Sequence, residues 1–189
     1  MCQTNECDSH TQESTSLKTP QVDKSSLSNL RILVVDDNID CLYLVKVIFE
    51  DYQAQVKTVT SVDQAIEAIE ESKPDVLISD ICMQGKDGYS LIRSIRRFEA
   101  KIGGFLPALA LTGYAHPQAR AKAFEAGFQE LIFKPFDPDK LVAEVAKLTQ
   151  LRYSSINKQT FLLNSVSVME TYKKVSINTK RIAKCQCIN

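Results

Sequence analysis

The segment Arg31-Ile-Leu-Val-Val-Asp36-Asp37 is an apolar run that stops at two adjacent carboxylates. Three other runs also end at a polar side chain: residues 76–79 at Asp80, residues 109–111 at Thr112, and residues 131–133 at Lys134. Continuous apolar runs separated by helix-length segments are typical of strands in a parallel sheet that is buried on both faces. The sequence therefore predicts an α/β fold in which four strands end at polar side chains.

The carboxyl ends of parallel strands share one edge of the sheet, where open α/β folds form their ligand crevice. This edge would hold the carboxylates of Asp36, Asp37 and Asp80. Like charges gathered in one crevice destabilise a fold unless a cation balances them. Mg²⁺ is a hard ion that prefers carboxylate oxygens and keeps several waters. We therefore expect these three aspartates to form a Mg²⁺ site.

Two further groups at the same edge suit an anionic guest. Lys134 cannot bind a metal cation but offers an ammonium group, and Thr112 offers a hydroxyl donor. Metal, ammonium, hydroxyl and a phosphate-sized anion together describe a phosphoryl-transfer site. Carboxylates can act as nucleophiles and form aspartyl-phosphates. Asp80 is the preferred nucleophile because it stands alone, which leaves the pair Asp36 and Asp37 to hold the metal.

At this point the residues resemble a known family, the receiver domain of two-component response regulators (the CheY-like superfamily). The resemblance covers roughly residues 30–150 and combines four motifs in the family's order and spacing. These motifs are Leu33-Val-Val-Asp36-Asp37-Asn38, Asp80-Ile-Cys-Met83-Gln-Gly-Lys-Asp87-Gly88, Ala110-Leu-Thr112-Gly113-Tyr114-Ala115 and Lys134-Pro135-Phe136. Each motif alone is weakly specific, whereas the ordered set is strongly specific.

The resemblance implies a function, a site and a fold. Asp80 would accept a phosphoryl group from a phosphohistidine of a histidine kinase or histidine phosphotransfer protein. Asp36 and Asp37 would hold Mg²⁺, and Thr112 and Lys134 would contact the phosphoryl oxygens. The fold would be flavodoxin-like (βα)₅, a doubly wound five-stranded parallel sheet of order 2-1-3-4-5. The peptide bond between Lys134 and Pro135 would be cis, as in the family.

Two positions depart from the family's pattern, and two others are expected to affect the lifetime of the phosphoryl group. Gln84 stands where the family usually has proline, so the loop after Asp80 is expected to be less rigid. Leu131 replaces the aromatic residue that often swings inward with the threonine on activation. Cys82 and Tyr114 occupy positions that influence water access to the phosphoryl group, and neither side chain orients water well. The resemblance therefore implies a slow autophosphatase.

The apolar spacing between the predicted strands is helical. For example, Leu42, Val45 and Phe49 recur at intervals of three and four residues. Ser61 begins a segment close to a capping box, and Gly127 is typical of a helix end. Helices are expected near residues 38–50, 61–70, 88–98, 117–126 and 137–148, and strands near 31–35, 55–59, 76–79, 107–111 and 129–133.

Simpler readings exist for single residues. Asp37 could be the N-cap of the helix that begins near Asn38, and Asp80 could be an ordinary turn residue after a strand. Neither explains why Thr112 and Lys134 occur in step with the acids. Other functions are also open: a phosphorelay intermediate that passes the group to another histidine, a Mg²⁺-dependent aspartyl phosphatase, and an inactive receiver-like adaptor. A phosphatase would need a second acid at position 82, which is cysteine.

The composition limits the class of protein. The chain has 189 residues, of which 44% are hydrophobic and 24% charged, as in a globular domain with additional segments. No apolar run reaches the roughly 18 residues that a membrane span needs, and the amino terminus does not read as a secretion signal. We therefore expect a cytoplasmic protein without a transmembrane segment, with its six cysteines reduced. The four tail cysteines lack the CxxC spacing that is usual for zinc.

The net charge of zero conceals an uneven distribution. Residues 151–189 contain seven basic residues and one acidic residue, whereas residues 1–29 are rich in small polar residues. We expect a disordered amino tail over 1–29, a receiver domain over 30–150, and a flexible basic carboxyl tail over 151–189. A tail of this length could not house a DNA-binding domain. The sequence thus predicts a single-domain response regulator that signals to an unknown downstream protein.

Overall fold

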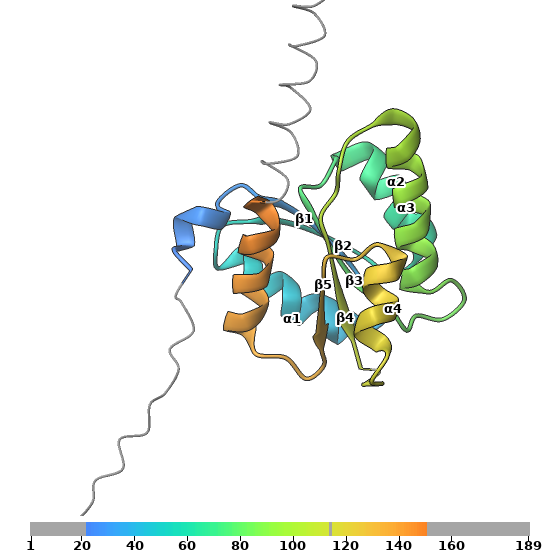
Figure 1. Ribbon diagram of the computed structural model, residues 1–189. Helices are drawn as coiled ribbons and strands as arrows, with labels where there is room; N and C mark the ends of the chain where they lie inside the picture. Colours follow the sequence, from blue (N-terminus) through green and yellow to red (C-terminus); the bar gives the residue numbers. More distant parts are fainter. Residues whose placement is uncertain (1–21, 114, 151–189) are drawn as a thin grey trace, which may run out of the picture.

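The computed structural model describes residues 22–113 and 115–150, which form an α/β domain (Figure 1). Five parallel strands make one sheet in the order β2-β1-β3-β4-β5. The strands are β1 (Arg31–Val35), β2 (Gln55–Val59), β3 (Val76–Asp80), β4 (Ala108–Thr112) and β5 (Glu130–Phe133). The helices are α1 (Ile39–Glu50), α2 (Val62–Ser72), α3 (Gly88–Ile102), α4 (Ala119–Ala126) and a further helix over residues 138–150. This is the predicted flavodoxin-like (βα)₅ fold with the predicted strand order.

The sheet order positions the site. β1 lies between β2 and β3, and its residue Val35 is in register with Ser79 of β3. The residues that follow, Asp36 and Asp80, therefore lie beside each other at the carboxyl edge. β3, β4 and β5 bring Thr112 and Lys134 to the same edge. The topological switch between β1 and β3 lies here, where doubly wound sheets bind their ligands.

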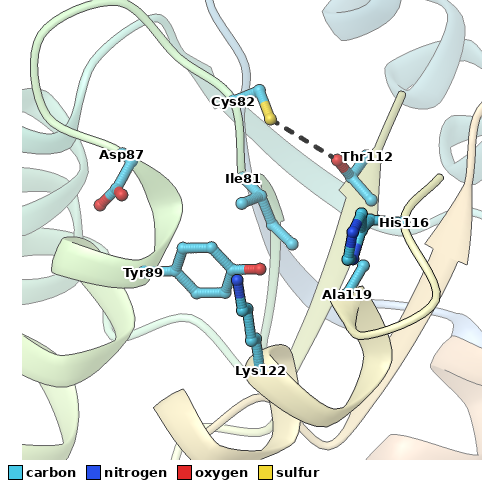
Figure 2. A pocket seen from close by; sticks show the side chains of 8 residues that line it. All are labelled: Ile81, Cys82, Asp87, Tyr89, Thr112, His116, Ala119 and Lys122. Carbon is cyan, nitrogen blue, oxygen red and sulfur yellow. Dashed lines mark hydrogen bonds between the residues drawn. The ribbon is translucent and has the colours of Figure 1, made fainter. Parts of the chain in front are cut away.

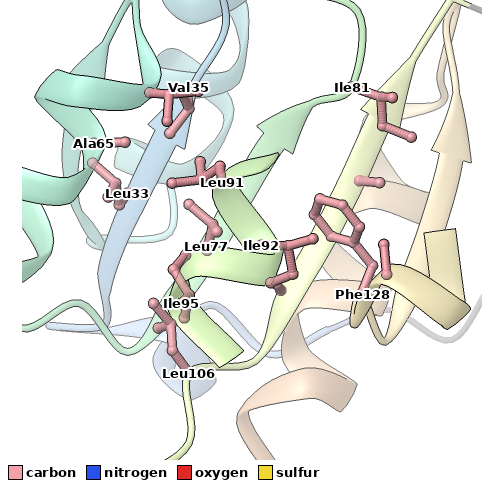
Figure 3. Close-up of a cluster of buried hydrophobic side chains, with 14 of the residues drawn as sticks. Leu33, Val35, Ala65, Leu77, Ile81, Leu91, Ile92, Ile95, Leu106 and Phe128 are labelled. Carbon is pink, nitrogen blue, oxygen red and sulfur yellow. The ribbon is translucent and has the colours of Figure 1, made fainter. Parts of the chain in front are cut away.

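Helices cover both faces of the sheet, as Figure 1 shows. α2, α3 and α4 pack on one face, and α1 and the helix over 138–150 pack on the other. Because successive side chains of a strand point to opposite faces, each buried strand contributes residues to two hydrophobic clusters, one on each face of the sheet. Leu33 and Leu77 join the first cluster, part of which appears in Figure 3, and Val34 and Ile78 join the second. Burial on both faces explains why β1, β3 and β4 read as largely apolar runs, whereas the edge strand β2 is partly exposed and carries polar residues.

Side-chain caps fix where the helices begin. The side chain of Asn38 accepts a hydrogen bond from the backbone N–H of Cys41 and caps α1, so Asp37 is not the cap. The side chain of Ser61 caps α2 in the same way. α3 extends four residues beyond the predicted end and stops before Gly103, which has a positive φ. The other predicted elements agree with the structure to within about two residues at each end.

The folded unit begins earlier than residue 30. Lys24–Leu27 form a 3₁₀ helix that is capped by the Asp23 side chain, and Leu27 is fully buried. The N–H of Asn29 donates to the carbonyl oxygen of Gln53, which ties this segment to the end of α1. Residues 22–29 were expected in the amino tail because the segment is mostly polar, and the burial of Leu27 could not be recognised from it. The remaining parts of both predicted tails, residues 1–21 and 151–189, lie outside the described residues.

Candidate functional site

The three predicted acids meet at the carboxyl edge of the sheet. Asp36, Asp37 and Asp80 each offer a carboxylate oxygen, and these oxygens lie within 4.8 Å of one another. Asp36 is 1% exposed and Asp80 7% exposed, whereas Asp37 faces solvent. Backbone N–H groups orient the buried pair: Asn38 donates to Asp36 Oδ1 at 2.9 Å, and Cys82 donates to Asp80 Oδ1 at 3.1 Å. The strand ends thus present a compact set of carboxylates.

Lys134 reaches into this cluster from the end of β5. Its Nζ lies 2.6 Å from Asp36 Oδ2 and 3.1 Å from Asp80 Oδ2. Burial lowers the pKa of the ammonium, but the hydrogen bonds and attraction to Asp36 and Asp80 outweigh burial, and the net pKa is raised. The following peptide bond, Lys134–Pro135, is cis. The structure therefore places a permanently charged ammonium group between two of the three acids.

Thr112 is fully buried at the end of β4. Its Oγ1 lies 3.9 Å from the Sγ of Cys82, on the loop after β3 (Figure 2). Beside this pair is a cleft of about 260 Å³ between the start of α3 and the start of α4. In Figure 2, Tyr89 and Lys122 point toward each other across this cleft, and His116 lies close to Thr112. The hydroxyl thus borders a space that opens from the site to the surface. Tyr114, which was expected to influence water access to the phosphoryl group, lies outside the described residues.

The loop after β3 packs closely against the cluster. The N–H of Gln84 donates to Asp37 Oδ2 at 2.9 Å, and the N–H of Gly88 donates to the carbonyl oxygen of Ile81 at 3.0 Å. Gly88 passes so near Asp80 that an added Cβ would lie 2.2 Å from the Asp80 carbonyl oxygen. The contact from Gln84 was not foreseen from the sequence, although the missing proline at this position signalled that an N–H was available.

Two other residues near the site have defined surroundings. Leu131 is buried in the cluster beneath α2, α3 and α4, so this position carries an aliphatic side chain packed in the core. Cys41, in the first turn of α1, is half-buried, and this burial together with the neighbouring Asp36 raises the pKa of its thiol to about 11. A neutral thiol adds no charge to the acids. The position of Cys41 beside the site was not predicted from the sequence.

The donor set of the cluster fits a hard divalent cation. Three carboxylates with oxygens this close repel one another, and the ammonium group of Lys134 contacts Asp36 and Asp80. The exposed carboxylate of Asp37 leaves room for the waters that Mg²⁺ retains. Sulfur and imidazole ligands do not form part of this group, which favours Mg²⁺ over softer metals.

Comparisons with known proteins agree with this geometry. The family described as response regulator receiver domain matches residues 32–146. A protein of Leptolyngbya boryana named as an uncharacterized 14.6 kDa protein in the sodA1 3′ region is 38% identical over 117 residues, which are 62% of this chain and 88% of that protein. The heme response regulator HssR of Staphylococcus haemolyticus is 28% identical over 154 residues, or 81% of this chain.

The chain spans 66% of the length of HssR, slightly less than two thirds. Among solved structures, the chemotaxis response regulator CheY4 of Vibrio cholerae superposes with a TM-score of 0.58 at 25% identity, over 64% of this chain and 99% of that one. Among the described residues, no helix is both long and apolar enough to cross a bilayer. A family match over more than half of the sequence, together with the fold and the acid cluster, shows that this chain belongs to the response regulator receiver domains of two-component systems.

Proposed function

We propose that this receiver domain accepts a phosphoryl group on Asp80 from a phosphohistidine of a histidine kinase or histidine phosphotransfer protein. The observation that carries the proposal is the position of Lys134, whose Nζ contacts both Asp36 Oδ2 and Asp80 Oδ2. This ammonium would pair with phosphoryl oxygens that arrive beside Asp80. The proposal assigns the acceptor role to the buried acid that stands alone at the end of β3.

The transfer is a substitution at phosphorus. A carboxylate oxygen of Asp80 forms the new O–P bond while the N–P bond to the donor imidazole breaks, and the imidazole nitrogen keeps the bonding electron pair. Lys134 offsets the negative charge on the phosphoryl oxygens, and Thr112 supplies a hydroxyl donor at the neighbouring strand end. Mg²⁺ held by Asp36, Asp37 and Asp80 would offset the same charge when bound.

The signal would follow from the added charge. Phosphorylation replaces the single negative charge of the Asp80 carboxylate with an acyl phosphate that carries up to about two, and this group would draw Thr112 and Lys134 toward it. The backbone N–H of Lys134 donates to the carbonyl oxygen of Thr112 at 2.8 Å, which supports coupled movement of these two strand ends. We expect the surface around α4, β5 and the helix over 138–150 to change what it binds. Because Leu131 is buried and aliphatic, this response would proceed without an inward-swinging aromatic ring.

Asp80→Asn tests the acceptor. The substitution keeps the shape of the side chain but removes the nucleophilic carboxylate, so phosphotransfer from a phosphorylated histidine kinase should fall to background. Glu67→Gln removes an exposed carboxylate on α2 and serves as the control, with unchanged labelling expected. Labelling is measured by phosphate transfer and by its release with hydroxylamine, which cleaves acyl phosphates. Retention of hydroxylamine-sensitive label in a folded Asp80→Asn protein would rule out Asp80 as the acceptor.

A further inference from the structure

The loop after β3 contacts the cation site through its backbone. The N–H of Gln84 donates to Asp37 Oδ2 at 2.9 Å. Proline, which the family usually has here, lacks this N–H and could not make the bond. The hydrogen bond therefore depends on a departure of this chain from the family pattern.

This contact falls on the acid that is otherwise most exposed. Asp36 and Asp80 are buried and are oriented by Lys134 and by backbone N–H groups. Asp37 faces solvent, where a carboxylate can rotate among several rotamers at little cost. Donation from Gln84 selects one orientation, in which a carboxylate oxygen of Asp37 lies within 4.8 Å of those of the other two acids.

We propose that the backbone N–H of Gln84 is a positioning group for the divalent cation site, and that cation binding in turn tightens the loop after β3. This inference rests on the proposed role of Asp36, Asp37 and Asp80 in holding Mg²⁺. Partners that orient a metal ligand from outside the coordination sphere change metal affinity by about 10- to 100-fold when they are removed. Coupling of this kind is reciprocal, so the cation must strengthen the bond by the factor by which the bond strengthens cation binding.

The side chains of Ile81 and Met83 anchor the first part of the loop in the core, and the bond of Gln84 follows directly after this anchor. Gly85 adopts a positive φ of 82°, which makes the turn that follows the contact. Lys86 Nζ pairs with Asp63 Oδ1 of α2 at 2.5 Å, but both side chains are more than 60% exposed, and exposed pairs contribute little. Beyond Met83, the bond of Gln84 is therefore the contact that holds the loop against Asp37, and the hydrogen bond from Gly88 to Ile81 fixes its far end.

A matched pair of variants separates the backbone of Gln84 from its side chain. Gln84→Ala removes the side chain and keeps the N–H, whereas Gln84→Pro also removes the N–H. Gln84 is not among the described residues with a positive φ, a conformation that would exclude the proline ring. Mg²⁺ binding is measured by calorimetry on the full chain, and thermal unfolding without Mg²⁺ compares the two folds. We expect Gln84→Ala to bind like the parent and Gln84→Pro to bind about tenfold or more weakly.

Hydrogen exchange in the parent tests the same idea without a substitution. Saturating Mg²⁺ should slow exchange of the Gln84 amide by a factor that matches the affinity difference between the variants. The amide of Gly103, which donates to Glu99 at the end of α3, serves as the reference that should not change. Equal Mg²⁺ affinity of the two variants would overturn the role of Gln84 but not the metal site itself. The same conclusion would follow if the parent bound Mg²⁺ and the exchange rate of the Gln84 amide did not change. Failure of the parent to bind Mg²⁺ would overturn the metal role as well.

Discussion

Gly88→Ala should disturb the turn that carries Asp80. An added Cβ would lie 2.2 Å from the Asp80 carbonyl oxygen and 3.0 Å from Ile81 Cα, and both are backbone atoms. The start of α3 and the Asp80 turn must therefore separate by about 0.8 Å before the closest contact reaches 3.0 Å. Crowding of this kind costs about 1–3 kcal/mol. For a domain of this size, that loss lowers the unfolding temperature by roughly 3–12 °C.

The change should also affect the reaction, because a displacement of about 1 Å at a reacting group can reduce a rate by about 100-fold. Thermal unfolding and the rate of phosphotransfer to Asp80 are measured on the same preparations. Gly113→Ala is the matched control, since its Cβ would meet no atom within 4 Å and Gly113 does not have a positive φ. The reasoning fails if Gly88→Ala unfolds at the temperature of Gly113→Ala and is phosphorylated at the same rate.

Three further predictions concern other parts of the domain. Leu27→Ala should lower the free energy of unfolding, measured by chemical denaturation, by about 2–5 kcal/mol because this side chain is fully buried. A loss below about 0.5 kcal/mol would mean that residues 22–29 do not belong to the folded unit. Lys134→Met should lower the free energy of unfolding by about 2 kcal/mol without Mg²⁺, less than the roughly 3–5 kcal/mol for a fully buried pair because Lys134 is 22% exposed. Mg²⁺ should raise the unfolding temperature more in this variant than in the parent. After donor removal, Cys82→Asn should lose phosphate severalfold faster than the parent because an amide can orient water where the thiol cannot; equal decay would remove the argument for a slow autophosphatase.

The strand ends were predictable because one physical rule governs them all. A strand buried on both faces reads as a largely apolar run, and the polar residue at which that run ends marks the edge of the sheet. Asp36, Asp80, Thr112 and Lys134 each obey this rule, and the structure brings the acids and Lys134 into contact as expected. Their roles in phosphoryl transfer remain a proposal.

The features that were not predictable depend on the path of the backbone. The contact of Gln84 with Asp37 uses a backbone N–H that every residue except proline carries, so the pattern of side chains could not predict it. Leu27 lies in a mostly polar segment, and it is buried in a cluster that includes residues of the helix over 138–150, which is distant in sequence. α3 runs past its last buried residue to Ile102, where amphipathic spacing no longer marks its end.

The ion pair between Lys134 and Asp36 joins residues that are 98 positions apart. During synthesis, β1 and β3 therefore leave the ribosome long before the lysine that balances their acids. Until Lys134 is added, the growing chain carries Asp36, Asp37 and Asp80 without the ammonium group that contacts Asp36 and Asp80 in the folded domain. A fragment that ends before Lys134 therefore lacks one of the groups on which the proposed acceptor site depends.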